Sequence, residues 1–309
     1  MKTITAVMWD PGDNLINKSL DEKMTLIEAK FKQAYQLAMA GDPDKDNTLV
    51  FLCPEFALLN MDASEKNFSY SKQAFQKAGE RLQKLVDDFP KAIIIPGTTY
   101  MEKNLDLADA KKKIKYADTI KKWQLRNFKP AQDFQQEIAG MTLVKNTSTA
   151  FFHSGDGTHK PKRYSKRIEA NELLEPFVGM FYPGHGEPFF TQNDIRFGLE
   201  ICADHKEGVL VSEQRRTGQT VDVHLIVANT IYTIPNKVAK DTAIVINCAG
   251  SFQSDIHAAK ATGVWIRDAD GTLKAVEMSP CSVDDLRIYA DIPLPTLKGE
   301  YSFSPNVLI

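Results

Sequence analysis

The feature that most constrains the fold is a regular alternation of short apolar segments and amphipathic segments in the first hundred residues. Residues 3–9, 48–52 and 92–97 are rich in aliphatic side chains and predict buried strands. Between them, residues 19–40 and 71–88 carry apolar positions at helical spacing. Strands that alternate with helices favour an α/β architecture in which helices cover a sheet.

The alternation continues beyond a long polar segment at residues 103–140, which we interpret as an insertion or lid. Further strands are predicted at 141–152, 195–201, 223–228 and 242–248, with a hairpin at 262–276 and a tail from Pro293. Ser154 to Gly157 predicts a hairpin turn, and a helix is expected through Val238 and Ala239. Without an internal repeat, this pattern favours one domain over residues 1–309.

Composition excludes several classes of protein. Of the 309 residues, 43% are hydrophobic and 25% are charged, which is typical of a globular chain. The net charge of −2 gives no overall attraction to nucleic acid or to an anionic membrane. No apolar window approaches the ~18 residues of a membrane helix, and the N-terminal apolar run is too short for a signal peptide. We therefore expect a soluble, cytoplasmic protein.

Four widely spaced cysteines predict neither a disulfide scaffold nor a four-thiolate zinc site. Cys202 differs from the other three because an apolar segment, residues 195–201, leads directly to it and a polar turn follows. A strand end is a suitable place to present a nucleophile. A thiol nucleophile also needs a base and an oxyanion stabiliser, which must come from elsewhere in the chain.

Two other segments supply such groups. Glu55 follows the apolar segment 48–52, and Lys166 lies in the basic run 159–167. Taken singly, each group has an ordinary explanation: a solvated carboxylate, a solvated lysine and a cysteine that packs as a small hydrophobe. Their order along the chain carries the functional interpretation.

In that order the three motifs resemble those of the nitrilase, or carbon–nitrogen hydrolase, superfamily. The motifs are Pro54-Glu55-Phe56, Tyr164-x-Lys166 and Gly198-x-x-Ile201-Cys202-x-Asp204, and the resemblance includes Asn146 and extends to the Ala269-Asp270-Gly271 hairpin. It implies a four-layer α-β-β-α sandwich of two mixed sheets flanked by helices. Such proteins often pair through their helical faces, so a homodimer or higher homo-oligomer is expected.

The resemblance also implies roles for individual residues. Glu55 is expected to be the general base, Lys166 to stabilise the oxyanion and Cys202 to be the nucleophile. A second glutamate is expected after the lysine, with Glu175 as the nearest match and Glu172 and Glu187 as rivals.

The chemistry expected from these residues needs neither a metal nor a cofactor. The Cys202 thiolate would attack an amide or nitrile carbon, while Lys166 and the backbone N–H of Ala203 stabilise the developing charge. A thioester would form, and Glu55 would activate the water that hydrolyses it. An amidase acting on a small amide or carbamoyl compound is favoured over a nitrilase.

Alternatives remain open at this stage. Residues 203–207 keep the aspartate of the family motif but lack its usual aromatic and Arg-Phe-Pro pattern, which leaves the substrate undetermined. A catalytically idle binding module and an acyltransferase using the same thioester are both compatible with the sequence. His205 could form a dyad with Cys202 or half of a zinc site, but no third member or second metal-binding pair follows. The basic run 159–167 is more typical of a solvated loop than of a nucleic-acid site.

Overall fold

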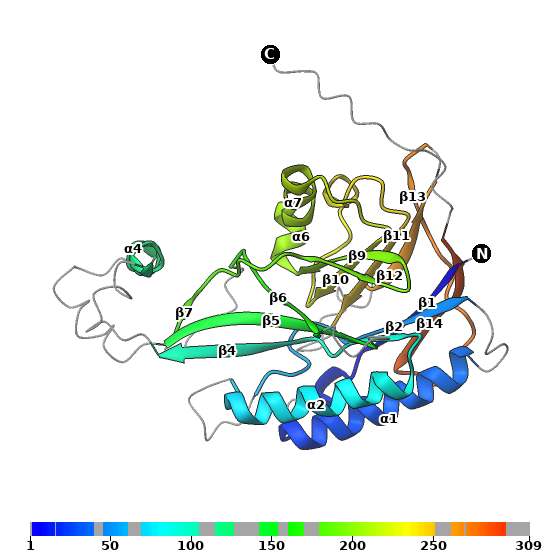
Figure 1. Ribbon diagram of the computed structural model, residues 1–309, viewed down its shortest axis with the longest axis horizontal. Helices are drawn as coiled ribbons and strands as arrows, with labels where there is room; N and C mark the ends of the chain where they lie inside the picture. Colours follow the sequence, from blue (N-terminus) through cyan, green and yellow to red (C-terminus); the bar gives the residue numbers. More distant parts are fainter. Residues whose placement is uncertain are drawn as a thin grey trace, which may run out of the picture.

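The computed structural model describes residues 2–15, 17–39, 46–60, 69–104, 115–126, 142–153, 160–169, 179–250, 261–268 and 270–294. These residues form two mixed β-sheets that pack face to face, with helices on both outer faces (Figure 1). The predicted α-β-β-α sandwich is therefore confirmed.

The first sheet has eight strands in the order β14-β1-β2-β3-β5-β4, and β6 and β7 also pair with β5. Strands β1, β2 and β3 are parallel, and β14 runs antiparallel to β1. Strand β5 runs antiparallel to β3, β4 and β6 but parallel to β7. The bounds are β1 (Thr3–Trp9), β2 (Asn47–Leu52), β3 (Ala92–Ile95), β4 (Thr98–Asn104), β5 (Thr142–Phe152), β6 (Lys162–Ser165), β7 (Gly179–Phe181) and β14 (Leu286–Pro293).

The second sheet has six strands in the order β13-β12-β11-β10-β9-β8. Its three central strands, β9, β10 and β11, are parallel, and the outer strands are antiparallel. The bounds are β8 (Phe189–Gln192), β9 (Ile195–Ile201), β10 (Val223–Ala228), β11 (Ile244–Ala249), β12 (Gly263–Arg267) and β13 (Leu273–Ala275). The carboxyl ends of the parallel strands in both sheets reach the same region, which is where α/β folds commonly bind ligands.

Among the described residues, a pair of helices packs on the outer face of each sheet. Helices α1 (Leu20–Met39) and α2 (Lys72–Asp88) pack on the first sheet, and α6 (Ala203–Glu207) and α7 (Val209–Thr217) pack on the second (Figure 1). Alternate residues of β1 face opposite layers: Met8 belongs to the core between the sheets, and Val7 to the core beneath the helices. This period of two is the reason that apolar residues occupy nearly every position of these strands.

Helix α7 packs closely on β9 at a glycine. A Cβ atom at Gly198 would lie 2.6 Å from the Cδ2 atom of Leu210 in α7 and 3.2 Å from Val221 Cγ2. A larger residue at this position would therefore have to displace the Leu210 side chain, which packs against the strand that leads to Cys202.

Several sequence predictions are confirmed: the strands at 3–9, 48–52, 92–97, 141–152, 195–201, 223–228 and 242–248, both early helices, and the hairpin at 262–276. The helix expected through Val238 and Ala239 is wrong. A short 3-10 helix, Pro235–Lys237, precedes these residues. The Ala239 N–H donates a hydrogen bond to the His224 side chain, 3.3 Å away, instead of to a helical carbonyl.

Other elements were not predicted. Strand β14 lies in the C-terminal part of the chain and pairs with β1, β8 forms within an expected loop, and α6 and α7 follow Cys202 directly. Of the 103–140 segment the structure describes the end of β4 and helix α4 (Ala117–Arg126). The rest of that segment and the turn expected at Ser154 to Gly157 lie outside the described residues. None of the described helices combines the length and apolarity needed to cross a membrane.

Candidate active site

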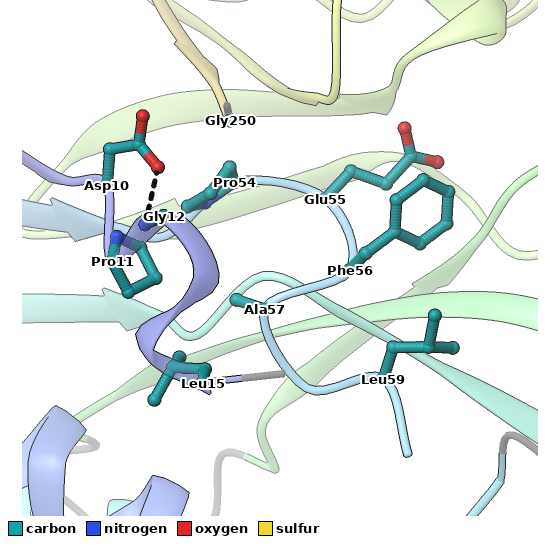
Figure 2. Close-up of a pocket in the computed structure, with 10 residues that line it drawn as sticks. All are labelled: Asp10, Pro11, Gly12, Leu15, Pro54, Glu55, Phe56, Ala57, Leu59 and Gly250. Carbon is teal, nitrogen blue, oxygen red and sulfur yellow. Dashed lines mark hydrogen bonds between the residues drawn. The ribbon is translucent and has the colours of Figure 1, made fainter. Parts of the chain in front are cut away.

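Glu55 follows β2 and is held between the two sheets. Its backbone N–H donates to the Ala228 carbonyl at the end of β10, 3.0 Å away, so the turn is anchored to the second sheet. The residue as a whole is only 2% exposed. In Figure 2 its carboxylate points away from Asp10 and Pro11, which lie on the far side of the turn. The β2 end therefore directs a carboxylate into the interior.

The Glu55 carboxylate forms an ion pair with Lys166, the residue that the motifs place in the same site. Lys166 Nζ lies 2.9 Å from Glu55 Oε1, and both side chains are fully buried. The amide Nδ2 of Asn146, on β5, donates to the same oxygen at 2.8 Å. The other oxygen, Oε2, is buried and has no hydrogen-bond partner among the described residues. One oxygen is thus held in place, while the other is available to accept a proton.

Lys166 is positioned by its own backbone. Its N–H donates to the Asn146 carbonyl at 2.8 Å, and its carbonyl accepts from Gly184 at 2.8 Å. A Cβ atom at Gly184 would lie 1.9 Å from the Ser165 carbonyl oxygen, so only glycine allows this approach. The lysine end of β6 is therefore fixed between β5 and the 183–188 loop.

Cys202 ends β9 in an unusual backbone conformation. Its φ of 47° and ψ of −106° lie in a region that L-residues rarely adopt, and its N–H donates to the Val227 carbonyl at 3.0 Å. The side chain is 6% exposed. Burial, first, and then the Glu55 charge raise the pKa of the Cys202 thiol to about 12, although Lys166 and a backbone hydrogen bond from Asn229 oppose the rise.

These electrostatic effects define the resting state of the site. Burial lowers the pKa of Lys166, but the charges of Glu55 and Cys202 raise it more, so that its pKa lies above the usual value. At neutral pH the lysine is charged, and the thiol keeps its proton. The Cys202 proton must therefore pass to a base when the thiol reacts. Glu55 is the carboxylate whose charge raises the pKa of this thiol, so it is the candidate base.

Asp204 connects the turn after Cys202 to the segment after Lys166. It is fully buried; its Oδ2 accepts from the Tyr164 hydroxyl at 2.7 Å, and its Oδ1 accepts from the backbone N–H of Arg167 and of Ile168 at 3.0 and 2.8 Å. Burial raises the pKa of Asp204 to about 7. The aspartate of the family motif thus holds the lysine segment against the nucleophile segment.

Tyr100 was not singled out by sequence reasoning, yet it lies near the same groups. Burial raises its pKa strongly, and the next causes are the charges of Glu55, Cys202 and Glu169. Its ring packs edge-on against Phe56, with 6.1 Å between ring centroids. No local pattern marks Tyr100, because it lies on β4 with many other polar residues.

A cavity of about 430 Å³, large enough for a small ligand, is lined in part by Arg167, Ile168 and Glu169, the three residues that follow Lys166 in the chain. It is lined by Lys115, Asp118, Thr119, Arg167, Ile168, Glu169, Phe181, Tyr182, Pro183 and His185. Its lining does not include Glu55, Lys166 or Cys202. A cavity on the opposite side of the Glu55 turn, shown in Figure 2, has only about 20 Å³ and is too small for a substrate.

The remaining predicted residues have different outcomes. Ala203, whose N–H is the second expected oxyanion donor, is buried and begins α6 directly after Cys202. Glu175 and its rival Glu172 lie outside the described residues, and Glu187 is exposed on the surface. Both ring nitrogens of His205 have partners other than Cys202, namely Glu200 and the Ile234 amide, so the alternative cysteine–histidine dyad does not form.

No protein-family model matches the sequence, and a search of curated protein sequences finds no match. The structure, in contrast, is similar to solved structures of nitrilase superfamily members. Nit3 of Saccharomyces cerevisiae, in branch 10 of the superfamily, is 14% identical with a TM-score of 0.50, and the match covers 93% of this chain and 89% of Nit3.

An amidase from Nesterenkonia sp. AN1 is 12% identical with a TM-score of 0.53, and the match covers 95% of this chain and 93% of the amidase. A glutamine-dependent NAD+ synthetase from Acinetobacter baumannii is 14% identical with a TM-score of 0.50; 93% of this chain matches 45% of the synthetase. The chain has the fold of the nitrilase superfamily, as the three motifs predict.

Proposed function

We propose that this chain, with its nitrilase-superfamily fold, is a carbon–nitrogen hydrolase of the amidase type that acts on a small amide or carbamoyl compound. The observation that carries the proposal is the buried Lys166–Glu55 pair, 2.9 Å apart, whose two charges both act on the Cys202 thiol. A buried ion pair is costly to desolvate and weak evidence for stability alone, so its presence beside a strained cysteine supports a chemical role.

In the first half of the reaction, Glu55 Oε2 takes the Cys202 proton as the sulfur attacks the substrate carbonyl carbon. Oε2 suits this role because it has no other hydrogen-bond partner among the described residues. The carbonyl oxygen becomes an oxyanion, stabilised by the Lys166 ammonium and the Ala203 N–H. When the tetrahedral intermediate collapses, the C–N bond breaks, and Glu55 returns the proton to the leaving ammonia or amine.

The second half hydrolyses the thioester on Cys202. Glu55, ionised again, removes a proton from water as the water oxygen attacks the thioester carbon. The same donors stabilise the second oxyanion, the C–S bond breaks, and the proton returns to sulfur as the acid leaves. Asn146 keeps Glu55 in one orientation through both halves, because it holds Oε1 at 2.8 Å and leaves Oε2 to carry the proton.

The structural similarity to an amidase supports an amide over a nitrile. A variant of the similar Nesterenkonia amidase has been solved in complex with butyramide. In this chain, the cavity of about 430 Å³ lined by Arg167, Ile168 and Glu169 is large enough for a small amide. The same proposal includes Glu175 as a second glutamate, residues 103–140 as an insertion or lid, a homo-oligomeric assembly and a cytoplasmic location.

Intact-mass spectrometry tests the proposal. The purified protein is incubated with a panel of small aliphatic amides, carbamoyl compounds and nitriles, and ammonia release is measured in parallel. We expect an acyl adduct on the wild-type protein that is absent in Cys202→Ala, with ammonia formed stoichiometrically with the acid. Cys281→Ala is the matched control and should keep both the adduct and the turnover, because Cys281 lies outside the site.

Other outcomes identify the alternatives. Turnover of the adduct only when an amine is added would indicate an acyltransferase and would exclude hydrolysis as the main reaction. Adducts from nitriles but not from amides would reverse the proposed preference. If no compound in the panel gives an adduct or ammonia, the hydrolase proposal is wrong, and the idle binding module is the better description.

A further inference from the structure

A second buried polar cluster lies on the opposite face of the strand that carries Cys202. Glu200 of β9 accepts at Oε2 from His205 Nδ1 of α6, at 2.9 Å, and from His224 Nε2 of β10, at 2.8 Å. Its Oε1 accepts from the Leu210 amide in the first turn of α7. All three side chains are completely buried. One carboxylate therefore joins two strands and two helices, and it satisfies an N–H at the start of α7.

The outer ring nitrogens determine where the protons lie. His205 Nε2 accepts the Ile234 N–H at 2.9 Å, and His224 Nδ1 accepts the Ala239 N–H at 3.3 Å. A nitrogen that accepts an N–H carries no proton, so the proton of each neutral ring is on the other nitrogen, facing Glu200. His205 is thus the Nδ1–H tautomer and His224 the Nε2–H tautomer, and both are neutral beside an ionised carboxylate.

This proton arrangement excludes a metal at the cluster. The three potential ligand atoms lie within 4.8 Å of one another, a spacing that suits a metal ion. A metal would, however, need the lone pairs of His205 Nδ1 and His224 Nε2, which are the two protonated nitrogens. Ligating histidines usually donate their second N–H to an acceptor, whereas here both second nitrogens face backbone donors.

We infer that Glu200, His205 and His224 are positioning residues that hold the Cys202 turn and the following segment 229–239 in place. Cys202 has a φ of 47° and a ψ of −106°, and such a conformation persists only where the surroundings fix it. Glu200 lies two residues before Cys202, and His205 three residues after it. The backbone N–H of His205 donates to the Cys202 carbonyl at 2.9 Å, and the bond between the His205 ring and Glu200 ties the two ends of this turn together through their side chains.

The cluster also fixes the neighbouring loop. The Ile234 and Ala239 amides anchor segment 229–239 through the two histidines, and this segment begins with Asn229, whose backbone bonds the Cys202 thiol. Asn247 Nδ2 holds the same segment through the Ile231 carbonyl at 2.8 Å. A shift of this loop would change the surroundings of the sulfur. The inference rests on the proposed function only in treating Cys202 as the reacting group.

Nitrogen NMR of protein labelled with 15N-histidine tests the proton arrangement without any substrate. At pH 7 we expect two neutral rings of opposite tautomer, assigned by the signals that disappear in His205→Gln and in His224→Gln. We also expect less than about a tenth of an equivalent of bound zinc, cobalt or nickel after dialysis against each ion. Rings of the same tautomer, a protonated ring or one stoichiometric metal ion would overturn the inference.

A matched pair of variants separates the two bonds of His205. In His205→Asn the amide N–H reaches Glu200 but the side chain is too short for Ile234; in His205→Gln the amide oxygen reaches the Ile234 N–H but the Glu200 bond is lost. If the cluster positions the loop, hydrogen exchange in residues 229–239 should be about tenfold faster in His205→Asn than in His205→Gln. Equal exchange, or the reverse order, would refute positioning through His205.

The two proposals fail separately. With an amide substrate, kcat should fall more in His205→Asn than in His205→Gln, while the tautomers and exchange rates need no substrate. If the NMR and exchange results are as expected but no variant or wild-type protein forms an acyl adduct, the proposed function is wrong and the positioning role stands. If wild-type protein turns over amides but exchange is equal in both variants, the positioning role is wrong.

Discussion

Replacing Lys166 by Met tests the central electrostatic argument. Methionine fills much of the lysine stem volume but removes the charge, which leaves the fully buried Glu55 carboxylate with Asn146 Nδ2 as its remaining described donor. Removing one partner of a buried ion pair typically costs about 3–5 kcal/mol of unfolding free energy. We expect a loss of that size at pH 8, together with a fall in amidase turnover of about 10²–10³ from the lost oxyanion donor.

The stability loss should depend on pH in a defined direction. In Lys166→Met the buried Glu55 carboxyl loses its cationic partner, and burial then favours its neutral, protonated form over the carboxylate. The folded state then binds the proton more tightly, so stability is retained at low pH and is lost as pH rises, by up to about 1.4 kcal/mol per pH unit. The difference from wild type should therefore be smaller at pH 5 than at pH 8.

Urea denaturation at both pH values measures the effect, provided that the m-values of wild type and variant agree. Lys160→Met, at an exposed lysine, is the matched control and should stay within about 0.5 kcal/mol of wild type. Glu55→Gln combined with Lys166→Met removes both charges and should recover most of the stability but none of the activity. If Lys166→Met alone lowers the unfolding free energy by less than about 1 kcal/mol at pH 8, the reasoning is refuted, because a loss that small is typical of a solvent-exposed ion pair.

Two further predictions concern the segments around Cys202. Cys202→Gly should abolish the acyl adduct but raise the unfolding free energy by about 1 kcal/mol, because glycine adopts the φ of 47° without strain; a loss of stability in urea would contradict this. Asp204→Asn should make stability depend less on pH between about 4 and 7. The folded-state pKa of Asp204 is raised to about 7, so in the wild type the contribution of this group to the unfolding free energy falls as pH rises through that range. Parallel stability profiles for the two proteins would show that Asp204 is not protonated in the folded state.

The strands and the ion pair could be predicted because each leaves a local signal. Apolar runs marked the parallel strands, and the motif order indicated that Glu55 and Lys166, 111 residues apart, lie together. Strand β14 has no such signal. Asp291 has a φ of 57° and the register with β1 shifts between Ile4 and Ala6, so an irregularity interrupts the alternation that would have revealed the strand.

The Glu200 cluster could not be predicted for a different reason. His205 follows the nucleophile, His224 is more distant in the sequence, and the two do not have the spacing of a metal-binding motif. They meet only because β9 and β10 pair in register. The Ala239 amide, used by His224, is also the reason that the helix expected there does not form. Bonds between side chains and the backbone of remote loops have no periodicity that a sequence can display.

The pairing of β1 with β14 has a consequence for synthesis of the chain. Residues 3–9 leave the ribosome well before their antiparallel partner, residues 286–293, so one edge of β1 stays without its partner until that later segment has been synthesised. At about 5–20 residues per second, this interval lasts roughly a quarter of a minute to one minute. During it, an apolar strand edge is open to other nascent chains, and chaperone binding or slow aggregation should be most pronounced on truncated chains that end before residue 286.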